Sequence, residues 1–246
     1  MAIRSLAGGR LFAEQYGMGA PRLLALHGWG RSHHDFAPAL QTLPGLAVDL
    51  PGFGASPAPE TTIGAAGYAR LLAPVLAEFT ESPVVVGHSF GGRVAVALAA
   101  QAPVKGLLLT GVPLLLNAQR KRPSPSYRLA RMAHRFRLLS DARIEQMRQT
   151  HGSADYRAAL GVMRQVLVVA VNESYEDEMS GLQVPVRLLW GAEDTEVPLE
   201  VAQRALALMQ TAGVDVELEM LTGVGHQVPL SAPIALAAAA KRLLDA

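Results

Sequence analysis

Hydrophobic and polar positions follow two alternating patterns along the 246-residue chain. Short apolar runs, typical of strands buried on both faces, are separated by longer segments whose apolar residues recur every three or four positions, as in amphipathic helices. The runs predict strands near 3–7, 10–16, 22–26, 45–49, 83–87, 106–110, 185–190 and 215–221. The longer segments predict helices at 33–42, 64–80, 91–101, 199–211 and 232–244.

Strands that alternate with helices are typical of the α/β class, in which helices cover both faces of a mainly parallel sheet. The sequence therefore predicts a mainly parallel eight-stranded sheet that begins with a hairpin. In such sheets the functional side chains lie at the carboxyl ends of the strands. Candidate chemistry is therefore expected directly after the apolar runs.

One interval departs from this alternation. Between the strands ending near 110 and starting near 185, the chain shows helical periodicity and no good strand. Such a connection far exceeds the usual two to six residues. We expect residues 113–181 to form a helical cap inserted into a single domain that spans 1–246.

A candidate nucleophile follows one of the buried runs. Val84–Val86 leads into Gly87-His88-Ser89-Phe90-Gly91, and a helical segment comes next. A Gly-x-Ser-x-Gly turn between a strand and a helix is typical of a nucleophile elbow, which exposes the serine hydroxyl on a sharp bend. Glycine is required where a Cβ would collide with neighbouring backbone. Ser89 is the predicted nucleophile.

A serine nucleophile needs a base that removes its proton and an acid that orients the base. Asp194 follows the apolar run 186–190, and His226 follows a glycine-rich loop after the strand near 215–221. Each alone has an ordinary interpretation, as a helix cap or as a surface histidine. The order serine, acid, histidine favours a triad of Ser89, Asp194 and His226.

The oxyanion site is expected from backbone amides. His27-Gly28-Trp29-Gly30 directly follows a buried strand. In this arrangement one amide comes from such an early loop and the other from the residue after the nucleophile. We therefore assign the two donors to the backbone N–H groups of Trp29 and Phe90.

These motifs together resemble the α/β-hydrolase family, in its compact serine esterase type. The matching segments span residues 10–244 in the expected order, and the His-Gly-Trp-Gly turn and the chain length are similar to those of pimeloyl-carrier-protein methyl esterases. The chain differs from that group at His88, Phe90 and Ser231, where tryptophan, leucine and glutamate are usual. The residues that carry the resemblance are His27–Gly30, Asp49–Ser56, Gly87–Gly92, Trp190–Asp194 with Val197–Pro198, and Gly225–His226.

The resemblance implies hydrolysis of a carboxylic ester with a small or medium acyl group, through an acyl-enzyme intermediate and without a cofactor. The same triad could serve a carbon–carbon bond hydrolase, a perhydrolase or an amidase. A ligand receptor built on a hydrolase scaffold is the alternative outside catalysis. Substrate turnover distinguishes the receptor from the enzymes.

Composition is that of a globular enzyme, with 50% hydrophobic and 17% charged residues. No cysteine is present, which excludes disulfides and thiolate metal sites. No signal-peptide pattern and no apolar run of membrane-spanning length is found. We therefore expect a cytoplasmic protein without membrane contact. The sequence does not predict the oligomeric state.

Charge is concentrated in the expected cap. Residues 119–148 carry nine basic and two acidic side chains, although the whole chain has a net charge of only +1. Such a patch could bind an acidic carrier protein or an anionic substrate, or could simply be a solvated helix face. No nucleic-acid recognition motif accompanies the charge, so nucleic acid is not an expected partner.

Further candidates concern the substrate pocket and a metal. The rings of Trp29 and Phe90, together with Met163 and Leu167 on an apolar helical stripe, are the predicted substrate contacts. The adjacent pair His33-His34 could suggest a metal ligand set. Neighbouring side chains on an α-helix diverge by about 100°, so we predict no metal site. Asp49 is expected to fix the Pro51–Gly54 turn.

Overall fold

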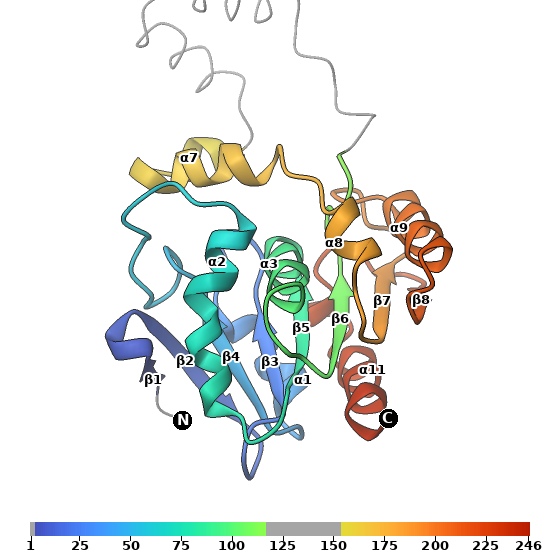
Figure 1. Cartoon of the computed structure of the whole chain (residues 1–246), viewed down its shortest axis with the longest axis horizontal. Helices are drawn as coiled ribbons and strands as arrows, with labels where there is room; N and C mark the ends of the chain where they lie inside the picture. Colours follow the sequence, from blue (N-terminus) through green and yellow to red (C-terminus); the bar gives the residue numbers. More distant parts are fainter. Residues whose placement is uncertain (1–2, 117–153) are drawn as a thin grey trace, which may run out of the picture.

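Eight strands form one sheet in the order β1-β2-β4-β3-β5-β6-β7-β8 (Figure 1). The computed structural model describes residues 3–116 and 154–246. Strands β1, β2 and β4 pair in antiparallel fashion, and all the other pairs are parallel. The predicted strands and the mainly parallel sheet are thereby confirmed. The strands are β1 (Ile3–Leu6), β2 (Leu11–Tyr16), β3 (Leu23–Leu26), β4 (Gly45–Asp49), β5 (Val84–His88), β6 (Gly106–Thr110), β7 (Val186–Gly191) and β8 (Val216–Leu221).

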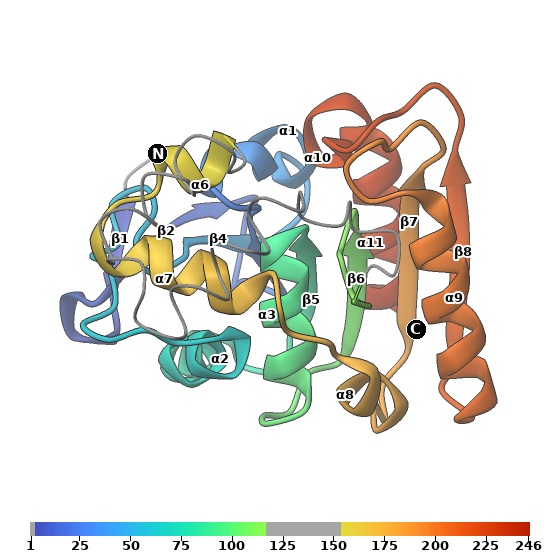
Figure 2. The same ribbon diagram turned by 90° about the horizontal axis from the view of Figure 1, so that it is seen from above.

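Helices cover both faces of the sheet because alternate strand residues point to opposite sides. Leu24 and Leu26 of β3 belong to the core beneath α2, α3, α8 and α9, whereas Leu23 and Ala25 belong to the core beneath α1 and α11. Figure 2 shows these two helical layers from above. The helices of the two layers are α2 (Ala65–Leu72), α3 (Phe90–Ala99), α8 (Glu176–Ser180), α9 (Leu199–Thr211), α1 (Ala37–Leu40), α10 (Val228–Ser231) and α11 (Pro233–Asp245).

Two predicted helices are shorter than expected. The segment 33–42 forms a 3₁₀ turn, η2 (His33–Phe36), followed by the short helix α1. The segment 64–80 is α-helical only to Leu72 and continues as the 3₁₀ helix η3 (Ala73–Glu78). Proline has no N–H to donate to the carbonyl four residues earlier and clashes with it, so Pro74 explains the end of α2.

The described part of the interval between β6 and β7 is helical. It contains α6 (Ala154–Ala158), α7 (Gly161–Ala170) and α8. Figure 1 shows α7 across the top of the molecule, above α2. The guanidinium of Arg93 in α3 donates to the carbonyl of Ala170, and the Ala65 amide donates to the Glu173 carboxylate over 3.2 Å. These bonds join the interval to the helices of the main layer.

The cap of residues 113–181 within one domain stays a prediction. Most of it, with all nine basic residues of the charged patch, lies at 117–153, outside the described residues. Across the two described ranges, no helix is both long enough and apolar enough to cross a membrane.

Candidate active site

Ser89 occupies the turn between β5 and α3, with a φ of 50° and a ψ of −115°. Residues other than glycine rarely adopt a positive φ, and such strain is found most often at functional sites. The Ser89 amide donates to the carbonyl of Thr110 at the end of β6, over 2.9 Å. The turn therefore has the strained geometry that the Gly-x-Ser-x-Gly pattern predicts.

The two glycines of the motif are required by the close approach of backbone segments. A Cβ on Gly87 would lie 2.5 Å from the Cα of Gly92. A Cβ on Gly91 would lie 2.1 Å from the carbonyl oxygen of Leu26. Both distances are far below van der Waals contact, and backbone atoms cannot rotate away as a side chain can. The packing of α3 against β3 thus depends on Gly91.

Gly91→Ala is expected to lower the free energy of unfolding by about 3 kcal/mol or more, because overpacking against backbone forces α3 away from β3. The measurement is urea unfolding followed by circular dichroism. Gly181→Ala is the matched control, since a Cβ there meets only ordinary contacts, at 3.4 Å from the carbonyl oxygen of Asp177. Equal stability of the two variants would contradict the proposed clash.

Asp194 and His226 are brought together at the ends of the neighbouring strands β7 and β8. The Asp194 Oδ2 atom lies 2.8 Å from the Nδ1 atom of His226. The other oxygen, Oδ1, accepts the amides of Glu196 and Val197 over 2.9 and 2.8 Å. Both side chains are buried. With Nδ1 donating to the carboxylate, the Nε2 atom of His226 is left to exchange a proton.

The His226 ring lies beside the serine turn. Its centroid is 4.9 Å from that of His88, the residue before Ser89. A Cβ at Gly111, directly after β6, would lie 2.9 Å from the ring atoms Cε1 and Nδ1. The ring thus lies near the ends of β5 and β6, and its role as the base of Ser89 stays a prediction.

The His-Gly-Trp-Gly loop packs against the serine turn. A Cβ on Gly28 would lie 3.5 Å from the Cβ of Ser89. The loop is anchored by His27, whose Nδ1 donates to the Gly28 carbonyl over 2.7 Å while Nε2 accepts the Leu50 amide over 2.9 Å. This bonding requires a neutral ring. It also connects the loop that carries Trp29 to the turn after β4.

Burial dominates the electrostatics of two histidines around the site. It lowers the pKa of His27 to about 4, although the hydrogen bond to Gly28 opposes the shift. It also lowers the pKa of His88 to about 4, and the neighbouring His226 acts in the same direction. Both rings are therefore neutral at pH 7.

Asp49 supports the same region as a buried carboxylate. Its Oδ1 accepts the His33 amide over 2.8 Å, and its Oδ2 accepts the Ala55 amide over 2.9 Å. Burial acts to raise the pKa of Asp49, but these bonds and the contact with the His33 ring hold it below the usual value. The carboxylate organises the turn that contains Pro51–Gly54, as the sequence predicts.

Aromatic rings gather over the serine turn. The Trp29 ring makes edge contacts with Phe53 and Phe90, at centroid distances of 4.9 and 5.3 Å. Phe90 also meets Tyr68 of α2 edge-on at 5.0 Å. The sequence predicted Trp29 and Phe90 as substrate contacts, which stays a prediction, and did not single out Phe53 or Tyr68 as part of this cluster. Phe53 lies in the segment Asp49–Ser56, which carries part of the family resemblance, and could have been included. Tyr68 occupies an apolar position of its helix, and no local signal distinguishes it from a core residue.

The two predicted pocket residues from the interval lie on α7. The Met163 sulfur is 3.8 Å from the Tyr68 hydroxyl, and a Cβ on Gly52 would lie 2.3 Å from that sulfur. Met163 thus contacts the aromatic cluster that adjoins Ser89. Leu167 is buried, and its role as a substrate contact stays a prediction.

A further carboxylate near His226 was not predicted. The Oε2 atom of Glu196 lies 3.6 Å from Nε2 of His226. The Glu196 side chain is 66% exposed, so solvent weakens this interaction. Its position two residues after Asp194 is the only sequence signal for it.

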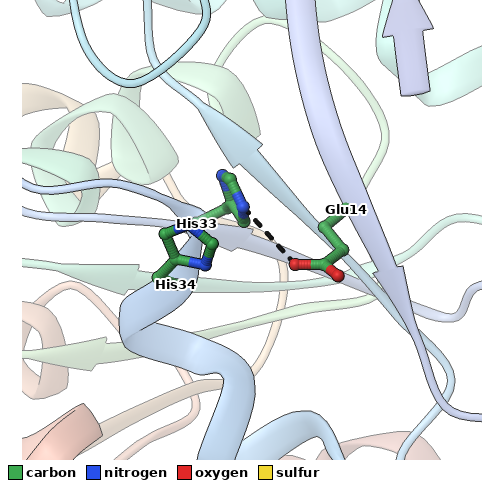
Figure 3. Close-up of side chains that lie close together, drawn as sticks. All are labelled: Glu14, His33 and His34. Atoms are coloured by element: carbon green, nitrogen blue, oxygen red, sulfur yellow. Dashed lines mark ion pairs between the residues drawn. The ribbon is translucent and has the colours of Figure 1, made fainter. Parts of the chain in front are cut away.

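A second cluster of titratable groups lies outside this site. Glu14, His33 and His34 place their ligand atoms within 4.8 Å of one another (Figure 3). The expectation that the two histidine rings diverge is wrong, because their centroids are 4.0 Å apart. The pair lies in the 3₁₀ turn η2, where neighbouring Cα–Cβ bonds diverge by about 120°, so the rings meet through side-chain rotation and not through backbone direction. The prediction of no metal site loses the geometric reason on which it was based.

Comparison with known proteins identifies the family. Residues 23–240 match the alpha/beta hydrolase family. The chain belongs to the α/β-hydrolase family. This α/β hydrolase is related to esterases, being 31% identical over 251 residues to the pimeloyl-[acyl-carrier protein] methyl ester esterase of Aromatoleum aromaticum, with 88% of this chain and 95% of that protein covered. The predicted fold and family resemblance are thereby confirmed.

A second curated relative is named as a synthase, and a solved structure shares the fold. It is 29% identical over 215 residues to the 2-succinyl-6-hydroxy-2,4-cyclohexadiene-1-carboxylate synthase of Pectobacterium atrosepticum, covering 78% of this chain and 85% of that protein. Its fold is similar to that of a serine hydrolase involved in carbazole degradation, with a TM-score of 0.72 and 19% identity, covering 99% and 98% of the two chains.

Proposed function

We propose that this chain is a serine hydrolase that cleaves carboxylic esters of small or medium acyl groups through an acyl-enzyme intermediate. One observation carries the proposal: Asp194 holds the His226 ring at 2.8 Å beside a strained serine turn. A buried carboxylate that orients a histidine next to a serine is the arrangement that activates a hydroxyl nucleophile.

In the proposed reaction, Nε2 of His226 takes the hydroxyl proton of Ser89 while the serine oxygen attacks the ester carbonyl carbon. The backbone N–H groups of Trp29 and Phe90 stabilise the oxyanion. His226 then returns the proton to the leaving alcohol. A water molecule, deprotonated by His226, attacks the acyl-serine and releases the acid, which restores the free hydroxyl.

We assign the acyl group to the apolar surface formed by the rings of Trp29 and Phe90, with Met163 and Leu167 from α7. Aromatic and aliphatic walls with few polar groups are typical of sites for such ligands. A cytoplasmic location and an acidic carrier protein bound at residues 119–148 are further parts of the proposal.

The other bonds that this triad could cleave stay open to test. One relative is named as a synthase, so ester hydrolysis has to be separated from other reactions. Carbon–carbon hydrolysis, perhydrolysis and amide hydrolysis are the remaining alternatives, and a ligand receptor is the alternative without turnover.

The testing experiment combines turnover and labelling. Hydrolysis of p-nitrophenyl esters from acetate to long chains is measured beside a matched p-nitroanilide and a ring-cleavage product. A fluorophosphonate probe is then applied, and the modified residue is identified by mass spectrometry. The expected result is ester turnover that peaks at a short or medium chain, with the probe on Ser89. A folded protein that shows neither turnover nor labelling would overturn the proposal in favour of a receptor.

A further inference from the structure

The ring of His33 is bonded on one side only. Its Nδ1 atom lies 2.8 Å from Oδ1 of Asp49, which also accepts the His33 amide. A carboxylate oxygen accepts, so Nδ1 carries the proton and Nε2 of the neutral ring carries a lone pair. That Nε2 atom is buried without a hydrogen-bond partner, and the whole residue is only 2% exposed.

The unpartnered nitrogen faces a second carboxylate. Oε2 of Glu14, on β2, lies 3.4 Å from Nε2 of His33 (Figure 3). The same Glu14 oxygen accepts the Tyr16 hydroxyl over 2.6 Å, which holds the carboxylate in place. A lone pair that faces a carboxylate oxygen in a buried site is unfavourable unless a positive centre lies between them. Two ligand atoms bound to one zinc ion in tetrahedral geometry are separated by about 3.3 Å.

His34 supplies a third donor from the solvent side. Its ring lies beside that of His33, and its ligand atom lies within 4.8 Å of those of Glu14 and His33. The residue is exposed, so its side chain can rotate toward an ion without disturbing the core.

We propose that Glu14, His33 and His34 bind one divalent ion of the zinc type, at a site separate from Ser89. Two imidazoles and one carboxylate suit zinc better than the oxygen-preferring calcium or magnesium. The bond from His33 to Asp49 is the kind of carboxylate contact that orients a metal-bound histidine. The bound ion fastens η2 to β2 and so stabilises the loop that precedes η2, which contains Trp29.

The competing explanation is a second proton on His33, which would make the ring a cation between Asp49 and Glu14. The two explanations predict different behaviour with metal. Zinc has to displace that proton in order to bind, so a site built only for a proton predicts no measurable zinc affinity, whereas the proposed site binds one ion for each chain.

The test uses the full chain without a histidine tag, freed of metal with a chelator and titrated with zinc chloride in a calorimeter at pH 7.5. We expect one zinc ion per chain with micromolar or tighter affinity. At a hundredfold excess of free zinc over the dissociation constant, the melting temperature is expected to rise by about 5–10 °C. Neither readout requires substrate turnover, so the result is independent of the proposed ester hydrolysis.

Two variants locate the ion. Glu14→Gln keeps an acceptor for Tyr16 but removes the charge, and His34→Ala alters only an exposed residue. Each is expected to weaken zinc binding at least about tenfold, as loss of a ligand does. The matched control His226→Ala removes a histidine paired with a carboxylate elsewhere and is expected to keep full zinc affinity. Absence of binding, or binding lost only in His226→Ala, overturns the proposal.

Discussion

Ser89→Ala is expected to lower the rate of ester hydrolysis by about 10⁴-fold or more, because the acyl group then has no oxygen to which it can be transferred. The variant should fold normally, since the lost hydroxyl belongs to a half-buried side chain. The hydrogen bond from the backbone amide of residue 89 to the carbonyl of Thr110 also remains. The measurement is the initial rate on the best p-nitrophenyl ester, with circular dichroism to verify the fold.

Combined variants test whether the three residues act as a unit. Ser89→Ala together with His226→Ala is expected to be no slower than either single variant, because a base without its nucleophile contributes nothing. The matched serine control is Ser180→Ala, a half-buried position on α8 whose hydroxyl donates to the carbonyl of Glu176. Additive losses, or a Ser89→Ala variant as active as Ser180→Ala, would refute the covalent mechanism.

Acidification from pH 7 to pH 4 is expected to remove about 6 kcal/mol from the free energy of unfolding. His27 and His88 each have a pKa of about 4 in the folded protein, against an ordinary value of 6.5. Below pH 6.5 the unfolded chain binds protons on these two residues, whereas the folded protein keeps the rings neutral. Their contribution to the free energy of unfolding is therefore present above pH 6.5 and is lost as the pH falls toward 4. Each ring accounts for about 3 kcal/mol of this loss.

The measurement is urea unfolding at half-unit steps of pH. His88→Phe is the test variant, because it removes one of the two rings with a lowered pKa and keeps His27, so its loss is expected to be about half that of the wild type. Asp49 does not interfere, since its pKa is lowered from 3.8 and its contribution to stability is lost only below that pH. A stability that stays constant between pH 7 and pH 4 would show that these rings are not buried as neutral groups.

Much of the fold could be predicted because its signals are local. A run such as Val84–Val86 predicts a buried strand wherever it is placed, and the glycines around Ser89 predict a sharp turn from steric limits alone. The predicted α-helix at 64–80 is too long, because its apolar spacing continues through Pro74 although Pro74 ends the α-helical hydrogen bonding. Apolar periodicity indicates which face of a segment is buried. It does not indicate where the backbone hydrogen bonding changes from α-helical to 3₁₀.

By itself, the sequence determined the class of fold, the strained serine turn and the order of Ser89, Asp194 and His226, since each depends on neighbouring residues or on strand ends that a parallel sheet brings to one edge. Only the tertiary structure decided which distant side chains meet. Tyr68 reaches Phe90 because α2 packs beside α3. Glu14 faces His33 because β2 pairs with β4, where Glu14 lies opposite Ala47. The physical reason is that strand order and helix packing are set by burial of the whole core, and no local pattern records them.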